Sequence, residues 1–352
     1  MMRPARKITL LLFLTTGLVF AGAAAQSNGQ DRGPAPTAGP AAQPGKQIYF
    51  LASDMRNGGV SGVFRGAEDA AHHLGWNLHQ LDGSGSQDKM GENLREAIAS
   101  HPDGLILAGF QPADFPLQIE AARQNKIVLV GWHAAEEPGP TDSLFVNVAT
   151  SAADVGEIAA NFVIDDARAH QSKIGVVIVT DDQFAVAKKK TRIMAERISA
   201  CKGYSGCEVL AVENMPISQA EREIPALVDR LSRKFTDRWT YTLAINDAYF
   251  DNINFPLIKA NRQDIRNVAA GDGSSKAVDR VRRGNSQQIA TIAEPLQMQG
   301  YQIMDEMNRA LAGKSPSGFQ SWPILVTAGM TRTVTEINEG SRAAYWAIWQ
   351  VR

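Results

Sequence analysis

The chain has 352 residues and nearly equal numbers of basic and acidic side chains, 36 against 37, which gives a formal net charge of −1. Because these charges are interspersed, the sequence lacks the clustered basic face that a nucleic-acid surface needs. Beyond its N-terminal segments the chain keeps roughly 300 residues, which is at the size limit for one hydrophobic core and predicts two lobes.

The N-terminus predicts a secretory signal peptide. Three basic residues within the first seven precede an apolar run over 8–20, and small residues close it at Ala23, Ala24 and Ala25. This order is typical of an export signal, and the run is shorter than the ~20 residues that span a bilayer. No cysteine lies near the cleavage point, so the sequence does not indicate a lipid anchor. We expect residues 1–25 to be removed and the mature chain to be periplasmic; an uncleaved anchor is the alternative.

Residues 26–45 are predicted to form a disordered Pro/Gly/Ala-rich leader. The segment contains Pro34, Pro36, Pro40 and Pro44 and few side chains that could bury apolar surface. Such a composition does not offset the entropy of ordering, so we expect a mobile segment.

The chain has two cysteines, Cys201 and Cys207. In an oxidising compartment such a pair usually forms a disulfide, and Gly203 and Gly206 give the short loop the backbone freedom that it needs. Closing so short a loop contributes about 2–3 kcal/mol. A redox-active pair is the alternative, but catalytic pairs favour a two-residue spacer.

Predicted strands and helices alternate along the rest of the chain. The first series consists of strand 48–52, helix 60–74, strand 76–81, helix 89–100, strand 104–108, helix 112–124 and strand 127–131. The second consists of helix 152–169, strand 174–180, helix 185–200, strand 208–212, helix 219–234, strand 240–245, helix 255–260, strand 268–270, helix 275–283 and strand 288–292.

This alternation predicts the α/β class. Continuous apolar strands between amphipathic helices are typical of parallel sheets covered on both faces, and two such series in tandem predict two doubly wound lobes. In such sheets ligands bind beyond the carboxyl ends of the strands. Residues that follow each strand are therefore the first candidates for a site.

Seven short segments at these strand ends carry a family resemblance. They are Ser53-Asp-Met-Arg-Asn57, Arg65-Gly-Ala67, Leu81-Asp82 with Gln87, Asp103-Gly-Leu-Ile-Leu107, Ala244-Ile-Asn-Asp247, Ala270-Gly-Asp-Gly273 and Ala290-Thr-Ile-Ala-Glu294. In this order they resemble the ribose/galactose-type periplasmic sugar-binding proteins of ATP-driven uptake systems, over about 46–327.

The resemblance implies a type I periplasmic binding protein fold, with two lobes joined by three chain crossings near Thr150, Glu294 and Trp322. The first lobe is then 46–150 plus 295–322, and the second is 151–294 plus 323–352. In this family the ligand binds between the lobes, a membrane permease recognises the closed form, and there is no catalysis. We therefore expect a monomer without cofactor or metal.

The resemblance also implies eight candidate ligand contacts. The residues that match polar family positions are Ser53, Asn57, Asn246 and Asp272. The residues that stand where the family commonly has other types are Lys190, in place of Arg, Trp132 and His133, in place of an Asp-Arg pair, and Glu294, in place of Gln or another polar residue.

Two departures from the family concern aromatic side chains. Gly59 and Val60 stand where aromatic residues often hold the sugar ring, and 217–219 has no aromatic residue either. Trp132 could instead offer its apolar face to the C–H side of a sugar. These departures put the usual hexose or ribose pose in doubt.

The candidate residues suit a ligand with many hydroxyl groups. Carboxylates at Asp272 and Glu294 accept hydrogen bonds, while Asn57, Lys190 and Asn246 donate them. Each position also has a structural explanation: Asp247 and Asp272 as helix caps, Ser53 and Asn57 as turn residues, Lys190 and His133 as surface residues, Glu294 as a solvent-facing carboxylate, and Trp132 as packing.

Other chemistry has little support. No zinc motif is present, and His72 and His73 point to different helix faces. A serine-hydrolase elbow is absent. Asp272 and Glu294 could mimic the two carboxyl groups of a glycosidase.

The sequence therefore predicts an exported binding protein that captures a sugar, polyol or similar small polar ligand for an ABC permease. One alternative is a periplasmic sensor that presents its ligand to a membrane receptor or kinase. Another is a binder of a cationic molecule, because carboxylates and aromatic faces attract cations. A cytoplasmic repressor shares the fold, but the signal peptide argues against it. A degradative enzyme would show turnover.

Overall fold

The computed structural model describes residues 33–201, 206–329 and 334–350. The predicted signal peptide, 1–25, lies outside these residues, as does the first part of the predicted leader. Among the residues described, no helix combines the length and the apolar character needed to cross a bilayer.

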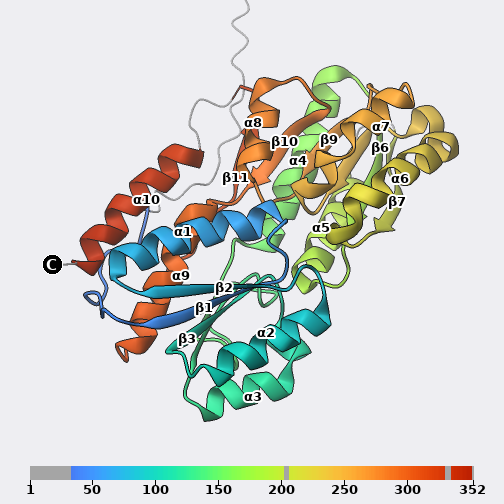
Figure 1. Cartoon of the computed structure of the whole chain (residues 1–352). Coiled ribbons are helices and arrows are strands. Elements are labelled where there is room, and N and C mark those ends of the chain that lie inside the picture. The colour runs from blue at the N-terminus through green and yellow to red at the C-terminus, as the bar shows by residue number, and fades with distance from the viewer. Residues whose placement is uncertain (1–32, 202–205, 330–333, 351–352) are drawn as a thin grey trace, which may run out of the picture. The chain divides into compact units, whose positions relative to one another are not determined.

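The first of two sheets has five parallel strands in the order β2-β1-β3-β4-β5. Its strands are β1 (Gln47–Ala52), β2 (Asn77–Asp82), β3 (Gly104–Ala108), β4 (Val128–Trp132) and β5 (Val146–Val148). Side chains alternate between its faces: Ile48 and Phe50 belong to one hydrophobic cluster, and Leu51 belongs to another. Its helices are α1 (Gly58–Leu74) and α9 (Leu296–Leu311) on one face and α2 (Gln87–Ala99) and α3 (Pro116–Gln124) on the other (Figure 1).

The second sheet has six strands in the order β11-β10-β9-β8-β6-β7, of which only β11 is antiparallel to its neighbour. Its strands are β6 (Ile174–Thr180), β7 (Cys207–Asn214), β8 (Tyr241–Ala244), β9 (Arg266–Ala269), β10 (Gln288–Ala293) and β11 (Ile324–Thr327). The helices that flank it are α4 (Ala152–His170), α5 (Ala185–Ser199), α6 (Ala220–Phe235), α7 (Asn254–Lys259) and α8 (Ser275–Arg283). Both sheets agree with the predicted α/β class.

The chain passes between the two sheets at three described segments. Residues 149–151 lead from β5 to α4, residues 294–295 lead from β10 to α9, and residues 312–323 lead from α9 back to β11. We call these the three crossing segments.

The C-terminal helix α10 (Val334–Trp349) packs with the first sheet. The family resemblance implied that 323–352 belongs to the second lobe, which the structure contradicts for this helix. Tyr345 and Trp349 are fully buried in the same hydrophobic cluster as α1 and α9, and Trp349 Nε1 donates a hydrogen bond to Asp305 at 2.8 Å. Helix α10 covers the outer face of α9, which would otherwise expose apolar surface to water.

The described part of the Pro/Gly/Ala-rich segment also packs on α9, which differs from the expected mobile leader. Asn308 Nδ2 donates to the carbonyls of Pro40 and Ala41 at 3.1 and 3.2 Å. The Ala42 amide donates to the Trp349 carbonyl at 2.8 Å. The composition predicted few apolar contacts for this segment. Its backbone is instead held by hydrogen bonds to the Asn308 side chain of α9 and to the Trp349 carbonyl of α10.

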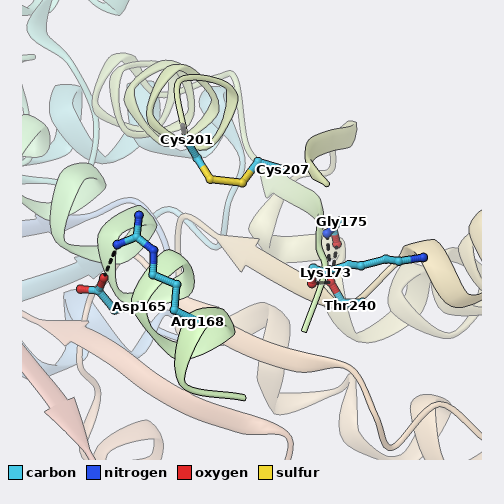
Figure 2. The surroundings of a disulfide bond; sticks show 7 residues. All are labelled: Asp165, Arg168, Lys173, Gly175, Cys201, Cys207 and Thr240. Carbon is cyan, nitrogen blue, oxygen red and sulfur yellow. Dashed lines mark hydrogen bonds and ion pairs between the residues drawn. A yellow bond between two sulfur atoms is a disulfide. The ribbon is translucent and has the colours of Figure 1, made fainter. Parts of the chain in front are cut away.

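Cys201 and Cys207 form a disulfide in the structure, with their Cα atoms 6.2 Å apart (Figure 2). This separation is ordinary for a disulfide. Cys201 follows the end of α5, and Cys207 begins β7, an edge strand of the second sheet. The bond therefore ties a helix end to a sheet edge. Residues 202–205, including Gly203, lie outside the described residues.

Candidate functional site

A small cavity lies beyond the carboxyl ends of strands from both sheets. The predicted contacts that line it are Ser53, Asn57, Trp132, His133, Lys190, Asn246 and Asp272. Some of these residues are more than 200 positions apart in the chain. They meet here because parallel strands end on the same edge of their sheet and ligands bind beyond that edge, which we call the strand-end rule.

Glu294, the remaining predicted contact, is fully buried behind the cavity wall. Its carboxylate accepts hydrogen bonds from His133 Nε2 at 3.0 Å, from Gln299 Nε2 at 2.7 Å and from the Thr150 amide at 3.3 Å. Burial alone would raise the pKa of Glu294, but His133, Lys190 and Gln299 outweigh it and hold this pKa well below its usual range. Glu294 is therefore an ionised structural carboxylate, and the alternative explanation as a solvent-facing carboxylate is wrong.

Lys190 extends from α5 into the cavity and is only 2% exposed. Its Nζ atom lies 3.9 Å from both Asp272 Oδ1 and Glu294 Oε1, and it makes no hydrogen bond with the described residues. A buried ammonium group carries three donors, and leaving them unpaired is costly. The group is thus attracted to both carboxylates while its N–H donors stay available to a ligand. The alternative explanation of Lys190 as a surface residue is therefore wrong.

Asp272 follows β9 and is the carboxylate that faces the cavity. Its Oδ2 atom accepts a hydrogen bond from Asn246 Nδ2 at 2.6 Å. Burial raises the pKa of Asp272, Lys190 opposes this change and Glu294 adds to it. A Cβ atom on Gly59 would come within 2.2 Å of Asp272 Oδ2. The carboxylate therefore occupies the space beside the start of α1 where the family often has an aromatic ring.

Asp247 holds the loop that carries Asp272, and it is not a helix cap. Its Oδ2 atom accepts a hydrogen bond from the Gly273 amide at 2.7 Å, and its other oxygen accepts one from Gln288 at 2.6 Å. Burial raises the pKa of Asp247 to about 6, against these hydrogen bonds. The cap of α8 is Ser274, which accepts from the Ala277 amide, so the capping explanation is wrong for both Asp247 and Asp272.

Trp132 and His133, at the end of β4, have different surroundings. Trp132 is only 2% exposed, and its Nε1 atom donates to Gln299 Oε1 at 2.8 Å. His133 has a backbone φ of 49°, a region that costs a non-glycine residue free energy and is often kept at functional sites. This conformation accompanies the contact between its imidazole and Glu294. Trp132 thus belongs mainly to the core, with one part in the cavity wall.

Ser53 and Asn57 lie at the start of the first series of elements. The Ser53 side chain makes no hydrogen bond with the described residues, although Ser53 is only 6% exposed. Asn57 caps α1 through its Oδ1 atom, which accepts from the Gly59 amide at 2.8 Å. This capping uses only the side-chain oxygen, so the side-chain amide nitrogen of Asn57 remains available at the cavity.

The apolar part of the cavity wall was not predicted from the sequence. The residues that form it are Val60, Phe184, Val186, Ala187, Ile217 and Ile245. Phe184 supplies an aromatic ring where no family landmark predicted one. It follows β6 by four residues, so the strand-end rule could have found it.

Residues 48–315 match a family model described as a periplasmic binding protein domain. No curated protein matches the chain significantly.

Solved structures of solute-binding proteins resemble this chain in fold. A glucose-galactose binding protein from Geobacillus stearothermophilus has a TM-score of 0.69 and 18% identity, covering 83% of this chain and 100% of that protein. An ABC transporter solute-binding protein from Agrobacterium vitis with bound allitol has a TM-score of 0.68 and 15% identity, covering 84% and 98%. A 5-methylthioribose-binding protein of a Thermotoga lettingae transporter has a TM-score of 0.70 and 15% identity, covering 85% and 93%. At these identities the similarity concerns the fold, and the predicted fold class is confirmed.

Proposed function

Because this chain belongs to the periplasmic binding protein family, we propose that it is an exported, monomeric solute-binding protein. In this proposal it captures a neutral sugar or polyol in the cavity and delivers it unchanged to an ABC permease in the membrane. The proposal agrees with the names of similar structures, one of which contains allitol and one of which binds glucose and galactose. A sensor would use the same cavity but present the ligand to a receptor or kinase.

The observation that carries the proposal is the set of unpaired polar groups in the cavity. Lys190 and Ser53 have donors without partners among the described residues, and Asp272 offers an acceptor in the same cavity. Sugar hydroxyls both donate and accept. Charge-assisted hydrogen bonds contribute about 1.5–3 kcal/mol each, so three or four, with apolar contact to Phe184, supply the ~8 kcal/mol of micromolar binding.

The same geometry disfavours a cationic ligand. Lys190 Nζ already stands 3.9 Å from Asp272 and from Glu294, so a cationic ligand beside Asp272 would have to compete with this ammonium group, which repels it at close range. The Trp132 ring is buried rather than open to a cation. A glycosidase role is disfavoured too, because such an enzyme needs two carboxyl groups beside the substrate and Glu294 lies behind the wall.

A thermal-shift screen tests the proposal. Pentoses, hexoses, linear polyols, acidic sugars and quaternary amines are added at about 1 mM to the mature protein. A neutral ligand with micromolar affinity stabilises the folded state by about 4 kcal/mol, which raises the melting temperature by several degrees. Stabilisation by a quaternary amine alone, or a recovered ligand with altered mass, would overturn the proposal.

Replacing Asp272 with Ala is expected to weaken binding of the sugar or polyol found in this screen by at least about tenfold, measured by calorimetry. The loss follows because the ligand hydroxyl loses its acceptor and Lys190 loses a neighbouring charge. Asp182→Ala is the matched control, since this exposed aspartate follows β6 but does not line the cavity. Equal affinities of the two variants would show that Asp272 does not contact the ligand.

A further inference from the structure

Gln299, the fourth residue of α9, is fully buried beside the cavity. Its amide uses both donors and its acceptor. The Oε1 atom accepts from Trp132 Nε1 at 2.8 Å, and the Nε2 atom donates to Glu294 Oε2 at 2.7 Å and to Ser321 Oγ at 2.9 Å. An amide satisfied in this way fixes the position of each partner.

Two of these partners, Glu294 and Ser321, lie in crossing segments, whereas Trp132 is the last residue of β4. Glu294 lies in the second crossing segment and also accepts from the amide of Thr150, in the first, at 3.3 Å. Ser321 lies in the third and is 4% exposed. One buried network therefore joins every crossing segment that the structure describes in full.

The same network reaches the cavity at two points. Trp132 bonds Gln299 directly, and His133 bonds Glu294 at 3.0 Å. Both residues line the cavity. A displacement of either side chain by a ligand would change hydrogen bonds that end at the crossing segments.

We propose that Gln299 is a positioning residue, which holds Trp132 and His133 in the cavity wall and couples them to the three crossing segments. Its role is to make the cavity wall and the crossing segments one cooperative unit, since a partly broken buried network leaves several groups unpaired at once. The inference rests on the proposed function, because positioning presupposes a ligand. All measurements below use the empty protein, so a failure of sugar binding would not affect their outcome.

The first test is hydrogen–deuterium exchange of the Thr150 amide. Gln299→Met keeps the volume but removes the hydrogen bonds, and we expect exchange at Thr150 to rise at least about tenfold, although the two residues share no direct bond. The matched control is Gln302→Met. Gln302 is 2% exposed on the next turn of α9 and donates to the Phe319 carbonyl at 2.8 Å, but it does not bond Glu294. Exchange at Thr150 should stay within about twofold in this control.

A pH profile provides the second readout. The titratable groups that face Glu294 are His133, Lys190 and Asp272, and all three remain in both variants. Since Gln299 helps to hold the pKa of Glu294 low, Gln299→Met should move the acid unfolding midpoint to higher pH, and Gln302→Met should not.

Equal exchange at Thr150 in the two variants would overturn the proposal and leave Gln299 as a packing residue. If Gln299→Met does not fold, Ser321→Ala carries the same test with a smaller change. It removes one hydroxyl in the third crossing segment and should raise Thr150 exchange, in the first, by about threefold. Unchanged exchange would again contradict the coupling.

Discussion

Replacing Trp132 with Ala is expected to lower the free energy of unfolding of the empty protein by about 3–5 kcal/mol. The ring is 2% exposed and packs in the same hydrophobic cluster as Ile106 and Val130. Its removal leaves a cavity and also deprives Gln299 Oε1 of its donor. Chemical denaturation of the empty protein measures the loss.

The variant Trp132→Phe separates the ring from its N–H group. It retains most of the packing but not the bond to Gln299, so the loss should be about 1–3 kcal/mol. A drop of less than about 1 kcal/mol for Trp132→Ala, with strongly weakened sugar binding, would contradict the core assignment. Trp132 would then be the stacking platform that the sequence predicted.

The sequence predicted the repeated elements well because each has a clear physical pattern. Strands 104–108 and 174–180 and helix 275–283 have the bounds that the sequence predicted. The predicted helix 112–124 is instead a short 3-10 turn, Pro112–Asp114, followed by α3. The break lies at Phe115, because a residue before proline disfavours the α conformation.

Elements outside the two series were not predicted. Strand β5 has only three residues, and β11 joins the second sheet antiparallel, against the parallel pattern. Helix α9 contains buried polar side chains such as Gln299 and Glu306, so its sequence looks less like a core helix than it is. The position of α10 depends on this polar helix, and no local pattern could reveal it.

The strand-end rule located the candidate site, but not the role of each residue. It predicted that Ser53, Asn246 and Asp272 would line one site, because the topology of a parallel sheet fixes the edge at which its strands end. The three residues do line one cavity. Glu294 obeys the same rule and yet faces His133 and Gln299 instead of the cavity. Which way a side chain turns depends on partners distant in the sequence, and these were not visible.

Replacing Glu294 with Ala is expected to cost about 3–5 kcal/mol of unfolding free energy at pH 7, as breaking one side of a buried ion pair does. It leaves His133, the Thr150 amide and Gln299 without their acceptor. The folded pKa of Glu294 lies below its ordinary value. Its contribution is therefore fully present above pH ~4.3 and is lost as the pH falls toward the folded pKa.

The control for this pH dependence is Glu306→Ala, which removes another fully buried carboxylate. Burial raises the pKa of Glu306 even though Ser317 donates to it, so the folded state binds its proton more tightly than the unfolded state. The contribution of Glu306 is therefore present at low pH and decreases as the pH rises through the folded pKa. Denaturant titrations between pH 3 and pH 7 should show opposite slopes for the two variants relative to wild type. Equal slopes would mean that His133 and Lys190 do not stabilise an ionised Glu294, because burial alone would then govern both carboxylates.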